Sequence, residues 1–154
     1  MGDKVVRNPI KKTSIEKKNK IIELGFKLMC EKGYYNVNCA DIAKYASVST
    51  GIIYQYFNDK KDIFIEGVKN YYDSIMYPMY DVLSTNINKN DLSKTINDLI
   101  DVFIKTHNIS KSSHENLMAM SYTMEEVKEI FNDNEMILTN KISEILKKEG
   151  FIIN

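Results

Sequence analysis

Side chains that can bond to bases and phosphates gather in one short segment of the sequence, residues 47–60. Gln55 can pair with adenine through two hydrogen bonds, and Thr50 places a hydroxyl group beside Gly51. An exposed glycine near a helix start weakens the helix by about 1 kcal/mol relative to alanine, but its missing side chain lets a phosphate or base edge come close. Thr50, Gly51 and Gln55 are therefore our candidate contacts with base edges.

Residue patterns typical of enzymes and metal sites are missing from the sequence. It contains no nucleophile elbow, no glycine-rich phosphate loop and no H-E-x-x-H motif. His107 and His114 are its two histidines, and no further metal ligands lie at close spacing. Cys30 and Cys39 are predicted to be ordinary reduced thiols. We expect no catalytic residue, no metal site and no cofactor.

Two short helices joined by a tight turn are predicted for residues 38–57. Asn38 can cap the first helix through its side-chain oxygen, and Asp41 favours the positive end of that helix. The helical period of apolar residues then breaks, and Ser49 begins a second helix as its cap. This second helix is predicted to span about residues 50–57.

The second helix has an apolar side and a side left for solvent or a partner. Val48, Ile53 and Phe57 fall on the inward stripe. The positions predicted to face outward are Thr50, Gly51, Tyr54, Gln55 and Tyr56. Cap residues, a turn and the small Ala43, which lets a crossing helix pack close by, all occur within about twenty residues. This combination favours a DNA-reading helix over an ordinary surface helix.

Several stretches of the sequence resemble the TetR family of transcriptional regulators, over roughly residues 17–68. They are I-I-E-L-G-F-K-L-M-C-E-K-G-Y from residue 21, D-I-A-x-x-A from 41, V-S-x-G from 48, Y-Q-Y-F from 54 and N-D-K-K-D-I-F from 58. Two positions depart from the family's usual pattern. Ser47 stands where a glycine usually supplies a left-handed backbone, and Ile52 stands where threonine is frequent.

The resemblance implies an all-α fold, with an N-terminal three-helix helix-turn-helix head followed by a helical bundle regulatory domain. The DNA-binding head with its basic arm would span residues 1–62, and the ligand-binding and dimerisation domain residues 63–154. Carried over from the family pattern, the candidate phosphate contacts are Asn38, Ser49, Tyr54, Tyr56 and Lys60.

The resemblance also raises the question of how two copies would pair. Family members usually continue past the position of Gly150 with helices that form much of the dimer interface. We therefore expect either a C-terminally shortened bundle or pairing through residues 113–131 and 134–149. The apolar positions available there are Leu117, Met120, Met124, Val127, Ile130, Ile137, Ile142, Ile145 and Leu146.

Charge is divided unevenly along the chain, although the formal net charge is zero. Residues 1–62 carry 12 Lys or Arg against 7 Asp or Glu, whereas residues 63–154 carry 9 against 14. The basic residues of the opening segment are Lys4, Arg7, Lys11, Lys12, Lys17, Lys18 and Lys20. Beside a helix-turn-helix, this basic arm is predicted to clamp phosphates or enter the minor groove, with salt-dependent affinity.

Helices are favoured throughout, because only six glycines and two prolines occur in 154 residues. We predict helices over residues 14–32, 39–45, 50–56, 60–76, 78–86, 91–108, 113–131 and 134–149, with breaks at Pro78 and at Asn132–Asn134. No run is long and apolar enough for a membrane span, and no signal peptide is evident. We expect a cytoplasmic protein.

Methionine and aromatic residues concentrate in the second half of the chain, where six of the eight methionines lie. Methionine is flexible and polarisable, so a cavity lined by such residues can accept flat apolar compounds. The candidate effector-pocket residues are Tyr72, Met76, Met79, Phe103, His107, Met118 and Tyr122. For any single residue of this stripe, however, a place in an ordinary core is the more common outcome.

Together these patterns predict a sequence-specific transcriptional regulator. A homodimer would place two recognition helices about 34 Å apart on a palindromic operator in double-stranded DNA. A small apolar or aromatic effector would release it, which makes repression the expected mode. One alternative is a helical adaptor that binds other proteins through its tyrosines without binding DNA. The other is a small α-helical enzyme.

Overall fold

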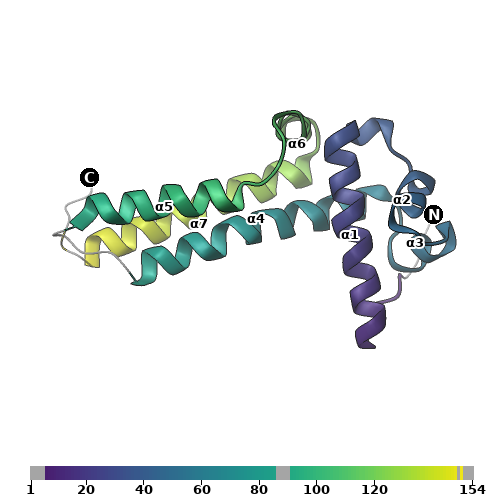
Figure 1. Ribbon diagram of the computed structural model, residues 1–154, viewed down its shortest axis with the longest axis horizontal. Coiled ribbons are helices and arrows are strands. Elements are labelled where there is room, and N and C mark those ends of the chain that lie inside the picture. The colour runs from purple at the N-terminus through teal and green to yellow at the C-terminus, as the bar shows by residue number, and fades with distance from the viewer. Residues whose placement is uncertain (1–5, 86–90, 149, 151–154) are drawn as a thin grey trace.

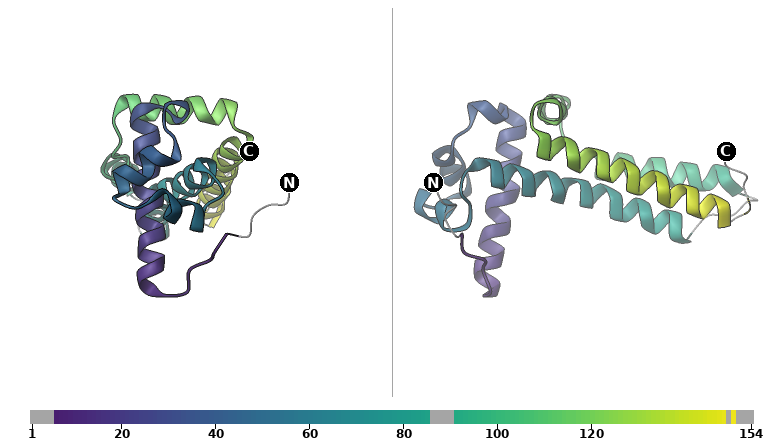
Figure 2. Two further views of the ribbon diagram at one scale, coloured as in Figure 1. Left: turned by 90° about the vertical axis from the view of Figure 1, so that its right-hand side faces the viewer. Right: turned by 180° about the vertical axis from the view of Figure 1, so that it is seen from behind.

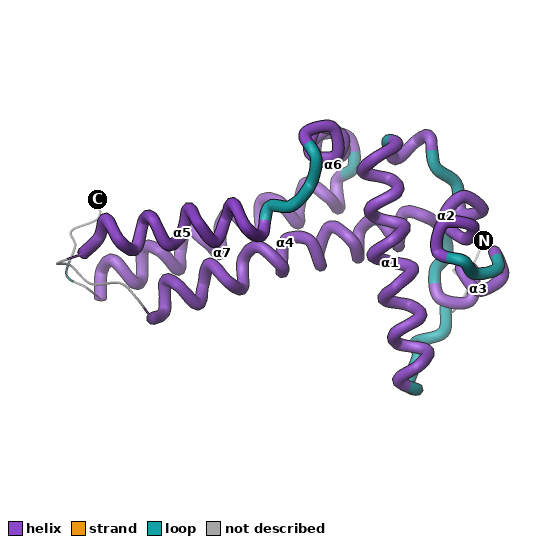
Figure 3. Tube along the Cα trace, in the orientation of Figure 1, coloured by secondary structure: helices purple, strands orange, loops and turns teal. Residues whose placement is uncertain are grey.

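The computed structural model describes residues 6–85, 91–148 and 150, and within these ranges it contains helices and no strand (Figure 3). The helices are α1 (Lys12–Lys32), α2 (Cys39–Ala46), α3 (Thr50–Tyr56), α4 (Lys60–Thr85), α5 (Leu92–Thr106), α6 (Lys111–Thr123) and α7 (Glu125–Lys148), with a 3₁₀ turn η1 (Tyr34–Asn36). The predicted all-α fold is confirmed.

The helices form a head and an elongated bundle, as Figure 1 shows. In the head, α1 packs against α2, and α2 against α3. Helix α4 leaves the head and packs along α5 and α7 to form the bundle. Helix α6 lies across the junction, in contact with both α1 and α7, and Figure 2 shows it beside the head from two further directions.

The core of the head forms where α1, α2, α3 and α4 meet. Ile21, Ile42 and Ile53 come from three different helices, and each is 0% exposed. Full burial of such an aliphatic side chain contributes about 1.5–3 kcal/mol. Gly25 allows α1 to pack closely against α4, because a Cβ atom at this position would lie only 2.7 Å from Cγ2 of Ile63. The recognition helix is thus held on a rigid base.

The turn between α2 and α3 is set by local hydrogen bonds. The side-chain oxygen of Asn38 accepts a hydrogen bond from the backbone N–H of Asp41, and the Asp41 carboxylate accepts one from the backbone N–H of Asn38, both at 2.9 Å. The predicted cap is confirmed as a complete capping box. At the other end of α2, Ser47 adopts the left-handed conformation, with φ of 57° and ψ of 46°. The turn therefore forms without the glycine usual at this position.

Two predicted helix breaks are wrong. Helix α4 continues through Pro78, so residues 60–76 and 78–86 do not form separate helices. Its packing against α5 and α7 compensates for the one backbone bond that proline cannot make. Helix α7 continues through Asn132–Asn134, and the real break is at Met124, where the backbone is extended. The Asn134 side chain bonds to the Ile130 carbonyl within the helix.

The described residues contain no helix that is both long and apolar enough to cross a lipid bilayer. The domain boundary that we predicted at residue 62 falls in the first turn of α4, a single helix shared by head and bundle. The head and the bundle are therefore joined by one continuous helix.

Candidate DNA-binding surface and internal cavity

The start of α3 is open to solvent. Thr50 and Gly51 are exposed, Tyr54 is 42% exposed, and Gln55 is partly exposed. A Cβ atom on Gly51 would meet nothing nearer than the Ser49 hydroxyl oxygen, at 3.8 Å. The three predicted base-edge residues thus share one accessible surface.

The residues that anchor α3 lie on its other side. Ile53 and Phe57 are buried as predicted, at 0% and 2% exposure. Tyr56 is only 5% exposed, so the expectation that it faces solvent is wrong. It stands three residues after Ile53, which places it on the same inward side of the helix. Tyr56 therefore belongs to the core of the head.

Ser49 and Asn38 are exposed at the starts of α3 and α2. Ser49 occupies the expected cap position, but its side chain makes no capping bond. Its hydroxyl group is therefore available to a phosphate. Asn38 uses its side-chain oxygen in the capping box, which leaves the amide nitrogen as the group that can donate to a phosphate.

Lys60 is partly exposed, and its ammonium group is bonded to the backbone of the head. Its Nζ atom donates hydrogen bonds of 2.7 Å to the carbonyl oxygens of Tyr34 and Val37. It also lies 4.3 Å from the centre of the Tyr34 ring. These bonds tie the start of α4 to the segment between α1 and α2. Two of the three N–H donors of Lys60 are thus used within the head, and its phosphate contact stays a prediction that rests on the third.

The basic arm is attached to α3. The Arg7 backbone N–H donates a 3.1 Å hydrogen bond to the Gln55 carbonyl, and the Arg7 side chain is exposed. Lys18, one turn into α1, has its Nζ atom 5.6 Å from the centre of the Phe57 ring. The arm therefore begins at the edge of the candidate reading surface.

Tyr54 lies beside the thiol of Cys39. A hydrogen bond with that thiol raises the pKa of Tyr54, with smaller contributions from the Cys39 charge, burial and Asp59. The hydroxyl group therefore stays protonated. Both cysteines are free and buried. Burial, followed by the charge of Glu31, raises the pKa of Cys30 to about 12, so its thiol is unreactive.

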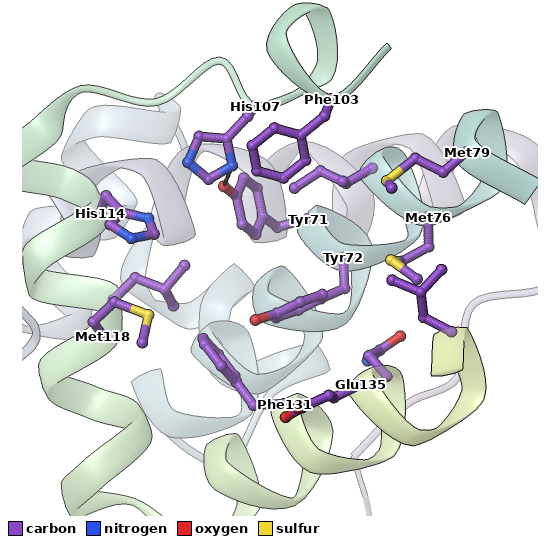
Figure 4. A pocket seen from close by; sticks show the side chains of 14 residues that line it. Tyr71, Tyr72, Met76, Met79, Phe103, His107, His114, Met118, Phe131 and Glu135 are labelled. Atoms are coloured by element: carbon purple, nitrogen blue, oxygen red, sulfur yellow. Dashed lines mark hydrogen bonds between the residues drawn. The ribbon is translucent and has the colours of Figure 1, made fainter. Parts of the chain in front are cut away.

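A cavity of about 340 Å³ lies in the bundle near α6 (Figure 4). Six of the seven predicted pocket residues line it: Tyr72, Met76, Met79, Phe103, His107 and Met118. Tyr122 does not, because its side chain points away and is 82% exposed. The volume of the cavity is at the lower end of the range of roughly 300–1,000 Å³ for small-molecule pockets.

Several lining residues were missed by sequence reasoning, including Tyr71, His114, Phe131 and Glu135. Tyr71 is next to Tyr72 on α4, and helical spacing along α4 indicates it. His114 and Glu135 come from helices whose limits were predicted wrongly. Their positions therefore depended on how α6 and α7 pack.

Polar groups gather at one end of the cavity. The Tyr71 hydroxyl and His107 Nδ1 are 2.9 Å apart, at hydrogen-bond distance. The His107 and His114 rings meet edge to face, with their centres 5.1 Å apart. Burial, followed by the nearby His114, lowers the pKa of His107. The two partly exposed rings thus lie close together at this end of the cavity.

Three of the apolar residues that we expected at a dimer interface are part of the chain's own core. Leu117 is 1% exposed, Met120 4% and Val127 0%. They are therefore not available to a partner in this arrangement. Ile137 remains 48% exposed. Within residues 6–85, 91–148 and 150, no three His, Cys, Asp or Glu side chains are placed to hold a metal ion.

Comparisons with known proteins match the head. Residues 21–66 fit the family model of bacterial regulatory proteins, tetR family. Over 59 residues the chain is 48% identical to the HTH-type transcriptional regulator HbdR of Aromatoleum sp. (strain CIB). The matched segment covers 38% of this chain and 26% of HbdR. Over 76 residues it is 33% identical to IcaR of Staphylococcus aureus (strain Newman), the negative transcriptional regulator of the biofilm operon icaADBC, covering 49% of this chain and 39% of IcaR.

The chain thus matches well under half the length of these two curated relatives. The whole fold is similar to the solved structure of the fatty acid degradation regulator FadR from Bacillus halodurans. The TM-score is 0.69, with 18% identity, over 94% of this chain and 74% of that one. At such low identity the likeness concerns the fold alone. Residues 21–66 of the chain thus form a DNA-binding head of the tetR type found in bacterial regulatory proteins.

Proposed function

We propose that the protein is a sequence-specific DNA-binding transcriptional regulator that represses its target genes. The observation that carries this proposal is the solvent-open start of α3, where Thr50 and Gly51 are exposed above a buried Ile53. A helix held in this way can enter the major groove with its first residues at the base edges. Gln55, on the next turn, then reads adenine.

The phosphate contacts come from groups around this surface. Tyr54 and Ser49 offer hydroxyl groups, Asn38 its amide nitrogen, and Arg7 a charged arm. Such contacts orient the head but carry no sequence information. Tyr56 is not among them, because it is buried, whereas the contact of Lys60 rests on its third N–H donor.

A homodimer on a palindromic operator is the second part of the proposal, because one seven-residue recognition helix reads only a few base pairs. Apolar side chains support an interface on the bundle. Ile96, Ile100 and Ile104 follow each other at one-turn spacing on α5 and are 49%, 50% and 66% exposed. Sedimentation equilibrium on the free protein tests the dimer.

The third part is release by a small apolar or aromatic effector in the cavity. Helix α4 lines the cavity with Tyr72 and Met76, and its first turn belongs to the head. An effector that prefers another position of α4 would change the distance between the two recognition helices. DNA and effector must then weaken each other's binding by the same factor.

Fluorescence anisotropy with a duplex from upstream of the protein's own gene tests DNA binding, at several salt concentrations. For each phosphate neutralised, we expect the slope of log affinity against log salt to be about −0.9. Tyr54→Phe should weaken binding, whereas the matched change Tyr77→Phe, at an exposed site on α4, should not. A flat salt dependence, with both variants binding like the parent, would instead favour the protein adaptor.

A further inference from the structure

One end of the cavity holds a polar atom without a partner. Nδ1 of His114 is buried and makes no hydrogen bond to any described part of the chain. In Figure 4 the His114 ring extends from α6 toward His107 and Tyr71. A buried polar atom left unpaired costs free energy, which a bound ligand recovers when it supplies the missing bond.

The neighbouring groups favour a ligand with an acidic group. His107 and His114 can each offer an N–H group, and the Tyr71 hydroxyl is bonded to His107. The pKa of His107 is lowered by burial and by His114, and no carboxylate contributes to that shift. An acid bound here would meet donors and no competing negative charge.

The one carboxylate that lines the cavity, among the described residues, belongs to its other side. Glu135 is on α7 and acts on Tyr72, whose pKa is raised by burial, then by Tyr71 and by Glu135. Tyr72 in turn packs edge to face on Phe131, with ring centres 4.8 Å apart. Glu135 itself is exposed. The cavity thus has a basic end, an apolar middle and an acidic mouth.

We propose that the effector is a small apolar carboxylic acid whose carboxyl group binds between His107 and His114 while its body packs on Tyr72, Phe131 and Met76. This inference rests on the proposed function, since it names the ligand class of the effector cavity. The cavity volume of about 340 Å³ limits the body to a single ring or a short chain.

Binding should take up a proton. The titratable groups in contact with His107 are Tyr71 from α4 and His114 from α6. Tyr72 of α4 and Glu135 of α7 line the same cavity. At neutral pH the His107 imidazole is uncharged, because its pKa is lowered. A carboxylate beside the two rings favours their protonated form, so affinity for the acid should rise as pH falls from about 8 to about 6.5.

Matched probes test the ligand class on the full chain by isothermal titration calorimetry, without DNA. They are 3-phenylpropanoate, 3-phenylpropanamide and 3-phenylpropylammonium, which share one body, with octanoate as a second acid. We expect the acids to bind about tenfold or more tightly than the amide and the amine, as for a hydrogen bond to a charged group. Titration in buffers of different ionisation enthalpy should show net proton uptake.

Two single substitutions in the cavity test its two ends separately. His114→Phe keeps a ring but removes the unpaired nitrogen, so it should weaken the acids about tenfold and leave amide binding unchanged. It should also raise the thermal midpoint of the free protein, which excludes a general loss of folding. Glu135→Gln removes the negative charge at the mouth of the cavity, so the acids should bind at least as tightly as they bind the parent.

Three results would overturn the inference. In the first, the amine binds more tightly than the acids, and Glu135→Gln loses that preference. In the second, the acid and the amide bind with equal affinity. In the third, neither acid binds. Anisotropy with the upstream duplex is measured on the same samples. If the acids fail while salt-dependent DNA binding persists, only the ligand class falls. If DNA binding fails while the acids bind, the regulator proposal falls instead.

Discussion

The side-chain amide of Asn116 donates a 2.8 Å hydrogen bond to the backbone carbonyl of Cys30. This bond joins α6 to α1 across 86 residues of sequence. The next two residues on α6, Leu117 and Met118, line the cavity. One helix therefore touches the cavity and is bonded to the head, so a ligand that displaces α6 also acts on α1.

Asn116→Ala tests the strength of this connection. The change removes the donor and leaves the Cys30 carbonyl unpaired, so the free energy of unfolding should fall by about 1–2 kcal/mol. Urea denaturation measures it. The matched control is Asn132→Ala at an exposed site on α7, where we expect a change within about 0.5 kcal/mol. Equal effects of the two variants would mean that the bond adds no stability.

Gly51→Ala should separate DNA binding from folding. A Cβ atom there meets open space, so the helix should gain up to roughly 1 kcal/mol of stability. DNA affinity should fall about tenfold or more, because the added methyl group occupies the point of closest approach. At Gly67 a Cβ atom would overlap the Phe26 side chain, so Gly67→Ala should instead destabilise the fold by about 1–3 kcal/mol. Unchanged DNA affinity in Gly51→Ala would contradict the proposed approach.

Ser47→Gly should stabilise the head. The left-handed conformation of Ser47 costs a residue with a side chain about 1–2 kcal/mol, and glycine adopts it freely. Part of that gain is lost to the greater freedom of glycine in the unfolded chain, so we expect a net gain of about 1 kcal/mol. Ser143→Gly, within α7, should be destabilising. Urea midpoints of the two variants should therefore move in opposite directions.

Lys60→Met decides between a structural and a DNA-contacting lysine. Loss of its ammonium group leaves the carbonyl oxygens of Tyr34 and Val37 without this donor, which should cost about 1–3 kcal/mol of stability. The neighbouring Lys61 pairs with Glu126, and both side chains are more than a third exposed, so Lys61→Met should cost much less stability than Lys60→Met. A loss of DNA affinity in Lys60→Met with full stability would support the phosphate role that the sequence predicted.

Stability should fall as the solution becomes acidic, in part through His107. Its pKa is lowered by burial and by His114, so folding favours the neutral ring. This contribution is fully present above the unfolded pKa of about 6.5 and is lost as pH falls through the lower folded pKa. Thermal midpoints measured roughly between pH 7 and pH 5 should decline less steeply in His107→Gln than in the parent. Parallel curves would show that His107 does not contribute.

Local chemistry in the sequence determined much of the head. Asn38 and Asp41 are three residues apart, and a capping box needs only that spacing, so α2 could be predicted from the residues themselves. The exposed Thr50 and Gly51 likewise follow from helical periodicity. The family pattern did not, however, reveal the bonds of Lys60 within the head, because its two acceptors lie 26 and 23 residues earlier in the chain.

Tertiary structure decided the features that depend on contacts between distant segments. Pro78 predicts a break, yet packing along α5 and α7 keeps α4 continuous. The corner at Met124, and with it the place of Glu135 in the cavity, depends on how α6 crosses the junction. A proline inside a helix costs about 3 kcal/mol locally and a helix cap contributes about 1 kcal/mol, whereas burial of several side chains, at about 1.5–3 kcal/mol each, exceeds both. Packing therefore overrides local signals wherever the two compete.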